Sequence, residues 1–132
     1  MSAALYIVLE VDRPGFDTIV DGKALSRAEE QLAAAAKDLG VRSLMEFFSM
    51  SREEAVHQAE EFNTGLDIGS FQEEWFTAAD GLRSVRALLA YVDAQPDAVP
   101  VSAEVANELT GFAHVLEEAE KRGIRWHLSV DY

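Results

Sequence analysis

Hydrophobic and polar positions alternate at both ends of the chain. From Leu5 to Val11 every second residue is aliphatic, and from Ile124 to Tyr132 every second residue is aliphatic or aromatic. A period of two is typical of a strand with one apolar face. The sequence therefore predicts a strand at each end. The other face of the second strand would be polar, with Arg125, His127, Ser129 and Asp131.

Apolar residues recur at spacings of three and four between these strands, which is typical of helices. The first such segment runs from Ala24 to Leu39, and Gly40 follows it as a left-handed terminator. Ser51 and Glu54 form a capping box, which predicts that a second helix starts there and continues through Phe62.

Two longer helices are predicted in the second half of the chain. Thr77 with Asp80 is a cap signal for the first of them, and Pro96 closes it. Ser102 is predicted to cap the second, which ends at Gly123.

Three segments separate the predicted helices. Ser43 to Met50 is apolar enough for a buried strand or a short buried helix, and we favour the helix. Gly65 to Ser70 is predicted to be a loop, and Asp97 to Val101 a linker.

The order of elements predicts one α+β domain over residues 1–132. Its terminal strands would pair in a small sheet packed against about four helices. The sequence has no internal repeat and no linker long enough to separate domains. Because an isolated two-stranded sheet is marginal in water, helices, a third strand or a second subunit must cover it. A homodimer is one of these arrangements.

The charge balance narrows the function classes. The chain has 24 Asp and Glu against 11 Lys and Arg, a formal net charge of -13. That excess argues against a nucleic-acid surface, which needs clustered cations. It favours a basic protein partner, or serves solubility alone. The absence of Cys fits a reducing cytoplasmic setting, and no apolar stretch approaches the roughly 20 residues of a membrane span.

Acidic residues gather on the second predicted helix and just before the third. We predict a partner-binding surface comprising Glu53, Glu54, Glu60, Glu61, Glu73, Glu74 and Trp75. Glu54, His57 and Glu61 also have helical spacing suited to a metal, but such a site needs a second Glu-x-x-His sequence on a facing helix. For Trp75 and Phe76 we favour packing in the core, with Phe76 as a hydrophobic staple just before the cap residue Thr77.

The remaining candidates have simpler structural explanations. Arg83 and Arg86 would pair with acidic residues of this chain. His127, with Trp126 and Trp75, would line a pocket if the sheet face forms a cleft, yet Ser129 lies roughly 7 Å along the strand, too far to be its nucleophile. The Asp21-Gly22-Lys23 turn lacks the glycines of a phosphate-binding loop. We therefore assign no catalytic, cofactor-binding or metal-ligating residue.

The order of several short segments resembles small uncharacterised bacterial proteins with no assigned activity. These segments are Tyr6 to Glu10, Asp21 to Leu25, Trp75-Phe76, Asp80 to Leu82 and Trp126 to Tyr132. The resemblance covers nearly the whole chain and implies a bacterial cytosolic setting, but no activity.

Composition leads us to expect a non-enzymatic interaction protein, for example an immunity or antitoxin-like inhibitor that covers a basic partner. The alternatives are a small-molecule-binding protein or enzyme with a pocket between sheet and helices, and a carboxylate-rich metal-binding protein.

Overall fold

The structure is a computed structural model that describes residues 3–11, 14–18, 20–62 and 72–131, without the side chains at positions 52, 58, 59, 61 and 62. The strands are β1 (Ala4–Leu9) and β2 (Trp126–Asp131). The helices are α1 (Lys23–Arg27), α2 (Glu29–Leu39), α3 (Arg52–Phe62), α4 (Ala78–Ala94) and α5 (Ser102–Lys121), with short 3-10 helices η1 (Leu44–Phe47) and η3 (Pro96–Ala98). No helix in these ranges is long and apolar enough to cross a membrane.

The two terminal strands pair with each other, as predicted, and the fold is a single α+β domain. The pairing is antiparallel, a direction that the sequence left open. Opposite residues of an antiparallel pair project to the same face. One face therefore carries the apolar pairs Leu5 with Val130, Ile7 with Leu128, and Leu9 with Trp126. Leu128 and Trp126 are completely buried, so this face of the sheet packs on the hydrophobic core.

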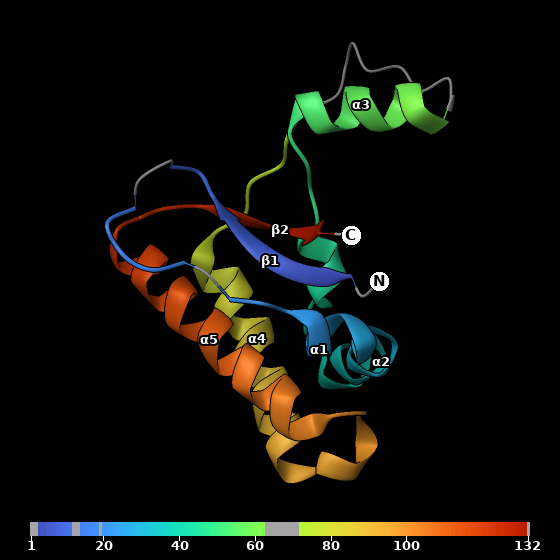
Figure 1. Cartoon of the computed structure of the whole chain (residues 1–132). Helices are drawn as coiled ribbons and strands as arrows, with labels where there is room; N and C mark the ends of the chain where they lie inside the picture. The colour runs from blue at the N-terminus through green and yellow to red at the C-terminus, as the bar shows by residue number, and fades with distance from the viewer. Residues whose placement is uncertain (1–2, 12–13, 19, 63–71, 132) are drawn as a thin grey trace.

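Helices α4 and α5 form the layer beneath that face, and α1 and α2 lie beside them (Figure 1). Both long helices bury stripes at spacings of three and four, typical of helices packed on one side. The stripes are Leu82, Val85, Leu88 and Val92 on α4, and Val105, Leu109, Phe112 and Leu116 on α5. This apolar layer covers the inner face of the two-stranded sheet, which would be only marginally stable in water by itself.

Short backbone pairings extend the sheet on both edges. Leu5 and Gly22 exchange two backbone hydrogen bonds of 3.2 and 3.0 Å, so the chain entering α1 lies against β1. A Cβ at position 22 would lie 2.3 Å from the Leu5 carbonyl oxygen, so only glycine permits this approach. On the other edge, β2 forms a parallel bridge through Leu128 to Phe48 and an antiparallel bridge through Trp126 to Phe76.

The segment from Ser43 to Met50 combines both structures that the sequence allows. Leu44–Phe47 is a 3-10 turn, and Phe48 then pairs with β2 in extended conformation. Leu44 and Phe47 are buried from the turn, and Ser49 from the extended part. The preference for a helix was therefore right only for the first half.

Two predicted helix boundaries are wrong. The single helix from Ala24 to Leu39 is divided at Ala28, whose φ of -95° and ψ of 6° depart from helical values. The predicted cap at Ser102 is absent, because α5 already includes Ser102 and the preceding Val101 takes the cap position with φ 44° and ψ 47°. The predicted caps at Thr77 and Gly40 are confirmed: the Thr77 hydroxyl accepts from the Asp80 amide at 3.2 Å, and Gly40 is left-handed.

Helix α3 stands apart from the other helices, on the opposite side of the sheet from α4 and α5 (Figure 1). Two extended segments flank it: residues 48–51 lead from the body into α3, and residues 72–76 follow α3 after residues 63–71, which lie outside the description. We call these two segments the connectors, and α3 together with them the arm. The predicted loop from Gly65 to Ser70 lies outside the described residues.

Candidate interaction site

The arm presents acidic side chains. Glu53, Glu54 and Glu60 are all exposed on α3, while the side chain of Glu61 lies outside the description. The predicted capping interaction at Ser51 is present, because the amide of Glu54 donates to the Ser51 hydroxyl at 3.2 Å. Carboxylates in the first turn also suit the positive end of the helix dipole. Local sequence therefore accounts for both the start of α3 and its charge.

The two connectors are fastened to β2 and to each other at the base of the arm. The Ser49 amide donates to the Leu128 carbonyl at 3.1 Å, and Phe76 and Trp126 exchange hydrogen bonds of 2.8 and 2.9 Å. The Glu74 amide donates to the buried Ser49 hydroxyl at 2.8 Å. These bonds fix where the arm leaves and re-enters the body.

A buried ionisable pair lies at the same place. His127 has 1% of its side chain exposed, and its Nε2 lies 2.6 Å from Oε2 of Glu73 on the returning connector. Its Nδ1 lies 3.0 Å from the Leu128 carbonyl oxygen. His127 and Ser129, on the predicted polar face of β2, are thus buried rather than solvated.

The predicted partner-binding residues before α4 differ in their surroundings. Glu74 is exposed. Glu73 and Trp75 are only half-buried and both contact His127, the Trp75 ring with a centroid distance of 4.8 Å. Exposed carboxylates on α3 and Glu74 are therefore accessible to a partner, while Glu73 and Trp75 also hold the arm to the sheet.

Aromatic rings fill the space beneath the connectors. The Phe47 ring lies 5.3 Å from that of Phe76 in an edge-on arrangement and 5.0 Å from that of Trp126. The guanidinium of Arg42 covers Phe47 and Phe76 at 4.8 and 5.0 Å. Phe76 therefore packs on the core through Phe47, a contact that a staple confined to α4 does not describe.

Trp126 and His127 were predicted to line a pocket. Trp126 is fully buried, its ring lies against Gly81 of α4, and its Nε1 donates to the Thr77 carbonyl at 3.1 Å. Both side chains are thus occupied by contacts within the fold. A ligand at these residues would have to displace such contacts, and the pocket remains a prediction.

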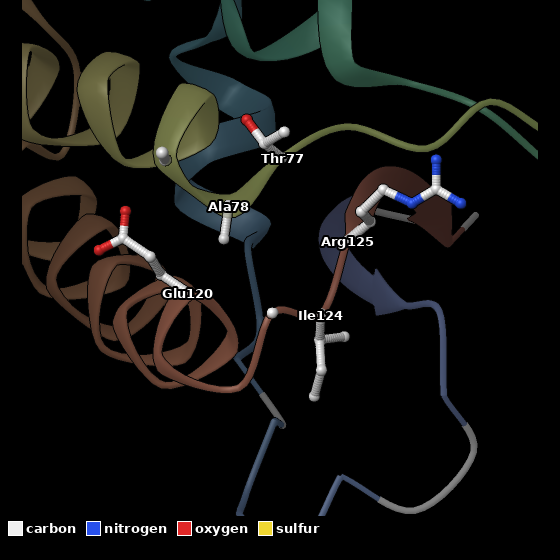
Figure 2. Close-up of a pocket in the computed structure, with 7 residues that line it drawn as sticks. Thr77, Ala78, Glu120, Ile124 and Arg125 are labelled. Carbon is white, nitrogen blue, oxygen red and sulfur yellow. The ribbon is translucent and has the colours of Figure 1, made fainter.

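A small hollow lies near the start of β2, between the beginning of α4 and the end of α5 (Figure 2). Its volume is about 160 Å³. Ligand pockets are commonly roughly 300 Å³ or more. Glu120 and Arg125 both line this hollow, but the Arg125 guanidinium points away from Glu120 (Figure 2). It instead donates from Nε to the Glu10 carboxylate at 2.8 Å.

The Glu10 carboxylate acts on Arg125 through two hydrogen bonds and through its charge, which raise the pKa of the guanidinium further above its ordinary value. Arg86 pairs with Glu117 at 3.2 Å, which confirms the expected pairing within the chain. Arg83 is exposed on the same helix. Arg86 on α4 and Arg125 just before β2 thus pair with acids of this chain, whereas the pairing of Arg83 stays a prediction.

The described residues contain no group of three or more His, Asp or Glu side chains placed to hold a metal ion. Glu54 and His57 are both exposed on α3. Because the third predicted ligand, Glu61, has no described side chain, a metal on this helix remains a prediction.

Sequence reasoning missed Ser49 and the link between His127 and Glu73. Ser49 lies 79 positions from Leu128, to whose carbonyl its amide donates, and His127 lies 54 positions from Glu73. The pairing of the connectors with β2 brings each of these residues to its partner. The one available signal was a polar Ser49 within the apolar segment from Ser43 to Met50.

No family model, no curated protein and no solved structure matches this chain significantly.

Proposed function

We propose that this protein is an acidic, non-enzymatic interaction protein that presents its arm to a basic protein partner. An immunity or antitoxin-like inhibitor is the concrete form of this proposal, since such a protein covers a cationic cleft. A homodimer and a bacterial cytosolic setting remain predictions beside it.

One observation carries the proposal. Glu53, Glu54 and Glu60 are exposed on a helix that stands apart from the body and is flanked by two fastened connectors (Figure 1). A projecting helix can enter a concave surface that a flat sheet or bundle face cannot reach. The net charge of -13 adds a long-range attraction to any cationic partner.

The test begins with capture of partners from lysate of the source organism at low salt, followed by release at high salt. The arm variant is Glu53→Gln, Glu54→Gln and Glu60→Gln together. The matched control changes net charge by the same amount elsewhere, through Asp93→Asn, Glu104→Gln and Glu120→Gln, all exposed in this structure.

The proposal expects one basic protein in stoichiometric amount, bound by the unaltered chain and by the control. With the purified partner, the arm variant should associate at least about tenfold more slowly at low salt, with a weaker dependence on ionic strength than the control. Equal rates for the two variants would remove the arm as the contact. Retention of a metabolite or a metal without protein would favour the pocket or metal hypothesis instead.

A further inference from the structure

The buried pair at the base of the arm constrains where its protons lie. The Leu128 carbonyl can only accept, so Nδ1 of His127, 3.0 Å away, must donate to it. Nε2 then faces Oε2 of Glu73 at 2.6 Å, and that contact needs a proton between the two atoms. Without this proton, a nitrogen lone pair would face a carboxylate oxygen in a site where His127 is 1% exposed.

We propose that Glu73 and His127 form a proton-dependent latch for the arm. With the proton in place, the returning connector is bonded to β2 through a side chain as well as through its backbone. When the proton leaves to water, Nε2 and Oε2 repel each other and residues 72–76 separate from β2. The outgoing connector is then held by fewer bonds, because Ser49 is fastened to Glu74.

This inference concerns the orientation of the arm relative to the sheet and does not depend on which partner, if any, the arm binds. It makes the orientation of α3 sensitive to pH. The structure places both connectors on the same edge of β2, and the bond from the Glu74 amide to the Ser49 hydroxyl links them, so a change at Glu73 reaches both.

Other ionisable groups lie near the pair and must be considered when the pH series is interpreted. Those on the same face of the sheet or on the connectors are Tyr6, Glu10, Arg125, Asp131 and Glu74. Residues 48–51 contribute no ionisable side chain. Arg125 is bonded to Glu10, so it is already neutralised by another carboxylate.

The experiment compares two observables on the full-length protein over the same pH series. Nuclear magnetic resonance of the His127 ring nitrogens reports loss of the proton. Hydrogen exchange, corrected for the intrinsic effect of pH, reports release of the connector through the amides of Glu74 and Phe76. Both amides are hydrogen-bonded in the closed arm, each at 2.8 Å.

The latch predicts that protection of these two amides falls by about tenfold or more, the equivalent of one hydrogen bond to a charged group. The midpoint of that fall should coincide with the midpoint of the His127 ring titration. Protection that stays constant while His127 loses its proton would overturn the proposal.

Two substitutions should remove the pH dependence while keeping the bond. In Glu73→Gln, the amide can donate to neutral His127 or accept from charged His127, so the arm should stay closed throughout. In His127→Gln, a permanent donor faces Glu73. His114→Gln is the control, since His114 is exposed on α5. If the buried His127 variant fails to fold, a pH-dependent arm in Glu73→Gln still overturns the latch.

Discussion

The carboxylate of Glu108 on α5 caps the start of α1, with Oε1 2.9 Å from the amide nitrogen of Leu25. Its other oxygen accepts from the amide of Ala24 at 3.2 Å. The first amides of a helix have no partner within the helix, and negative charge is favourable beside them. Asp21 of the preceding turn accepts only from the Lys23 amide, so a side chain 83 positions away in sequence caps the next two amides of α1.

Replacing this carboxylate should destabilise the fold. We expect Glu108→Ala to lower the free energy of unfolding by about 2 kcal/mol, because two amides at a partly buried helix start lose a charged acceptor. Glu108→Gln keeps one acceptor and should cost less. Chemical denaturation measures both. Glu120→Ala on the same helix is the control, and an equal loss there would show that the cap contributes nothing particular.

Caps made within a few residues were predictable from sequence, whereas this one was not. Thr77 with Asp80, and Ser51 with Glu54, are close in the chain, so their spacing alone predicts the hydrogen bond. Glu108 looks from sequence like one more acid on a helix. Only the packing of α5 against α1 gives it a role, and spacing along the chain carries no signal of that packing.

The candidate site likewise combines a feature that the sequence pattern predicts with one that depends on tertiary packing. The alternation of β2 correctly predicts that His127 and Ser129 share a face opposite Trp126. It cannot show that the connectors cover that face, because a polar pattern is typical of solvated and of hydrogen-bonded positions alike. The burial of His127 depends on Glu73 and Trp75, which reach it only through the pairing of Phe76 with β2.

Gly81 should resist substitution although it lies inside a helix. Gly81→Ala would gain about 1 kcal/mol from helix propensity alone. However, a Cβ at this position would lie 2.4 Å from the Trp126 ring, which is fully buried. Overpacking a core typically costs about 1–3 kcal/mol, so we expect a net loss of stability and an altered near-ultraviolet dichroism of Trp126.

The matched control for this substitution is Gly111→Ala on α5. Its Cβ would meet the half-buried side chain of Val20, with the two methyl groups at 3.1 and 3.2 Å. Because the Val20 side chain can shift, the gain in helix propensity should roughly offset the energetic cost of this contact. A Gly81→Ala protein as stable as the Gly111→Ala protein would show that Trp126 moves freely.

Glu118 should contribute a pH-dependent part of the stability. Hydrogen bonds from Arg122 and then Lys121 lower the pKa of its carboxyl below the ordinary value of 4.5. A carboxyl that titrates lower in the folded state stabilises the fold above its unfolded pKa, and this contribution disappears as pH falls through the folded pKa.

We therefore expect Glu118→Gln to be less stable than the unaltered protein at neutral pH, and the difference to shrink as pH falls below 4.5. Urea denaturation over a pH series measures it. Glu120→Gln removes a nearby negative charge without these hydrogen bonds and should stay close to the unaltered protein at neutral pH. A Glu118→Gln deficit that persists undiminished in acid would contradict the argument.

Val101 is strained where the chain enters α5. Its φ of 44° places a β-branched residue in the left-handed region, where the side chain crowds the backbone. Asn tolerates this conformation better, and Val101 is 39% exposed, so little apolar burial is lost on replacement. We expect Val101→Asn to raise the free energy of unfolding by about 1 kcal/mol. Val101→Ala loses similar apolar surface but keeps an ordinary Cβ in the left-handed region, so it should gain less. Thermal and chemical unfolding of the three proteins decide the matter: if Val101→Asn is no more stable than Val101→Ala, the backbone at this position relaxes in solution and carries no strain.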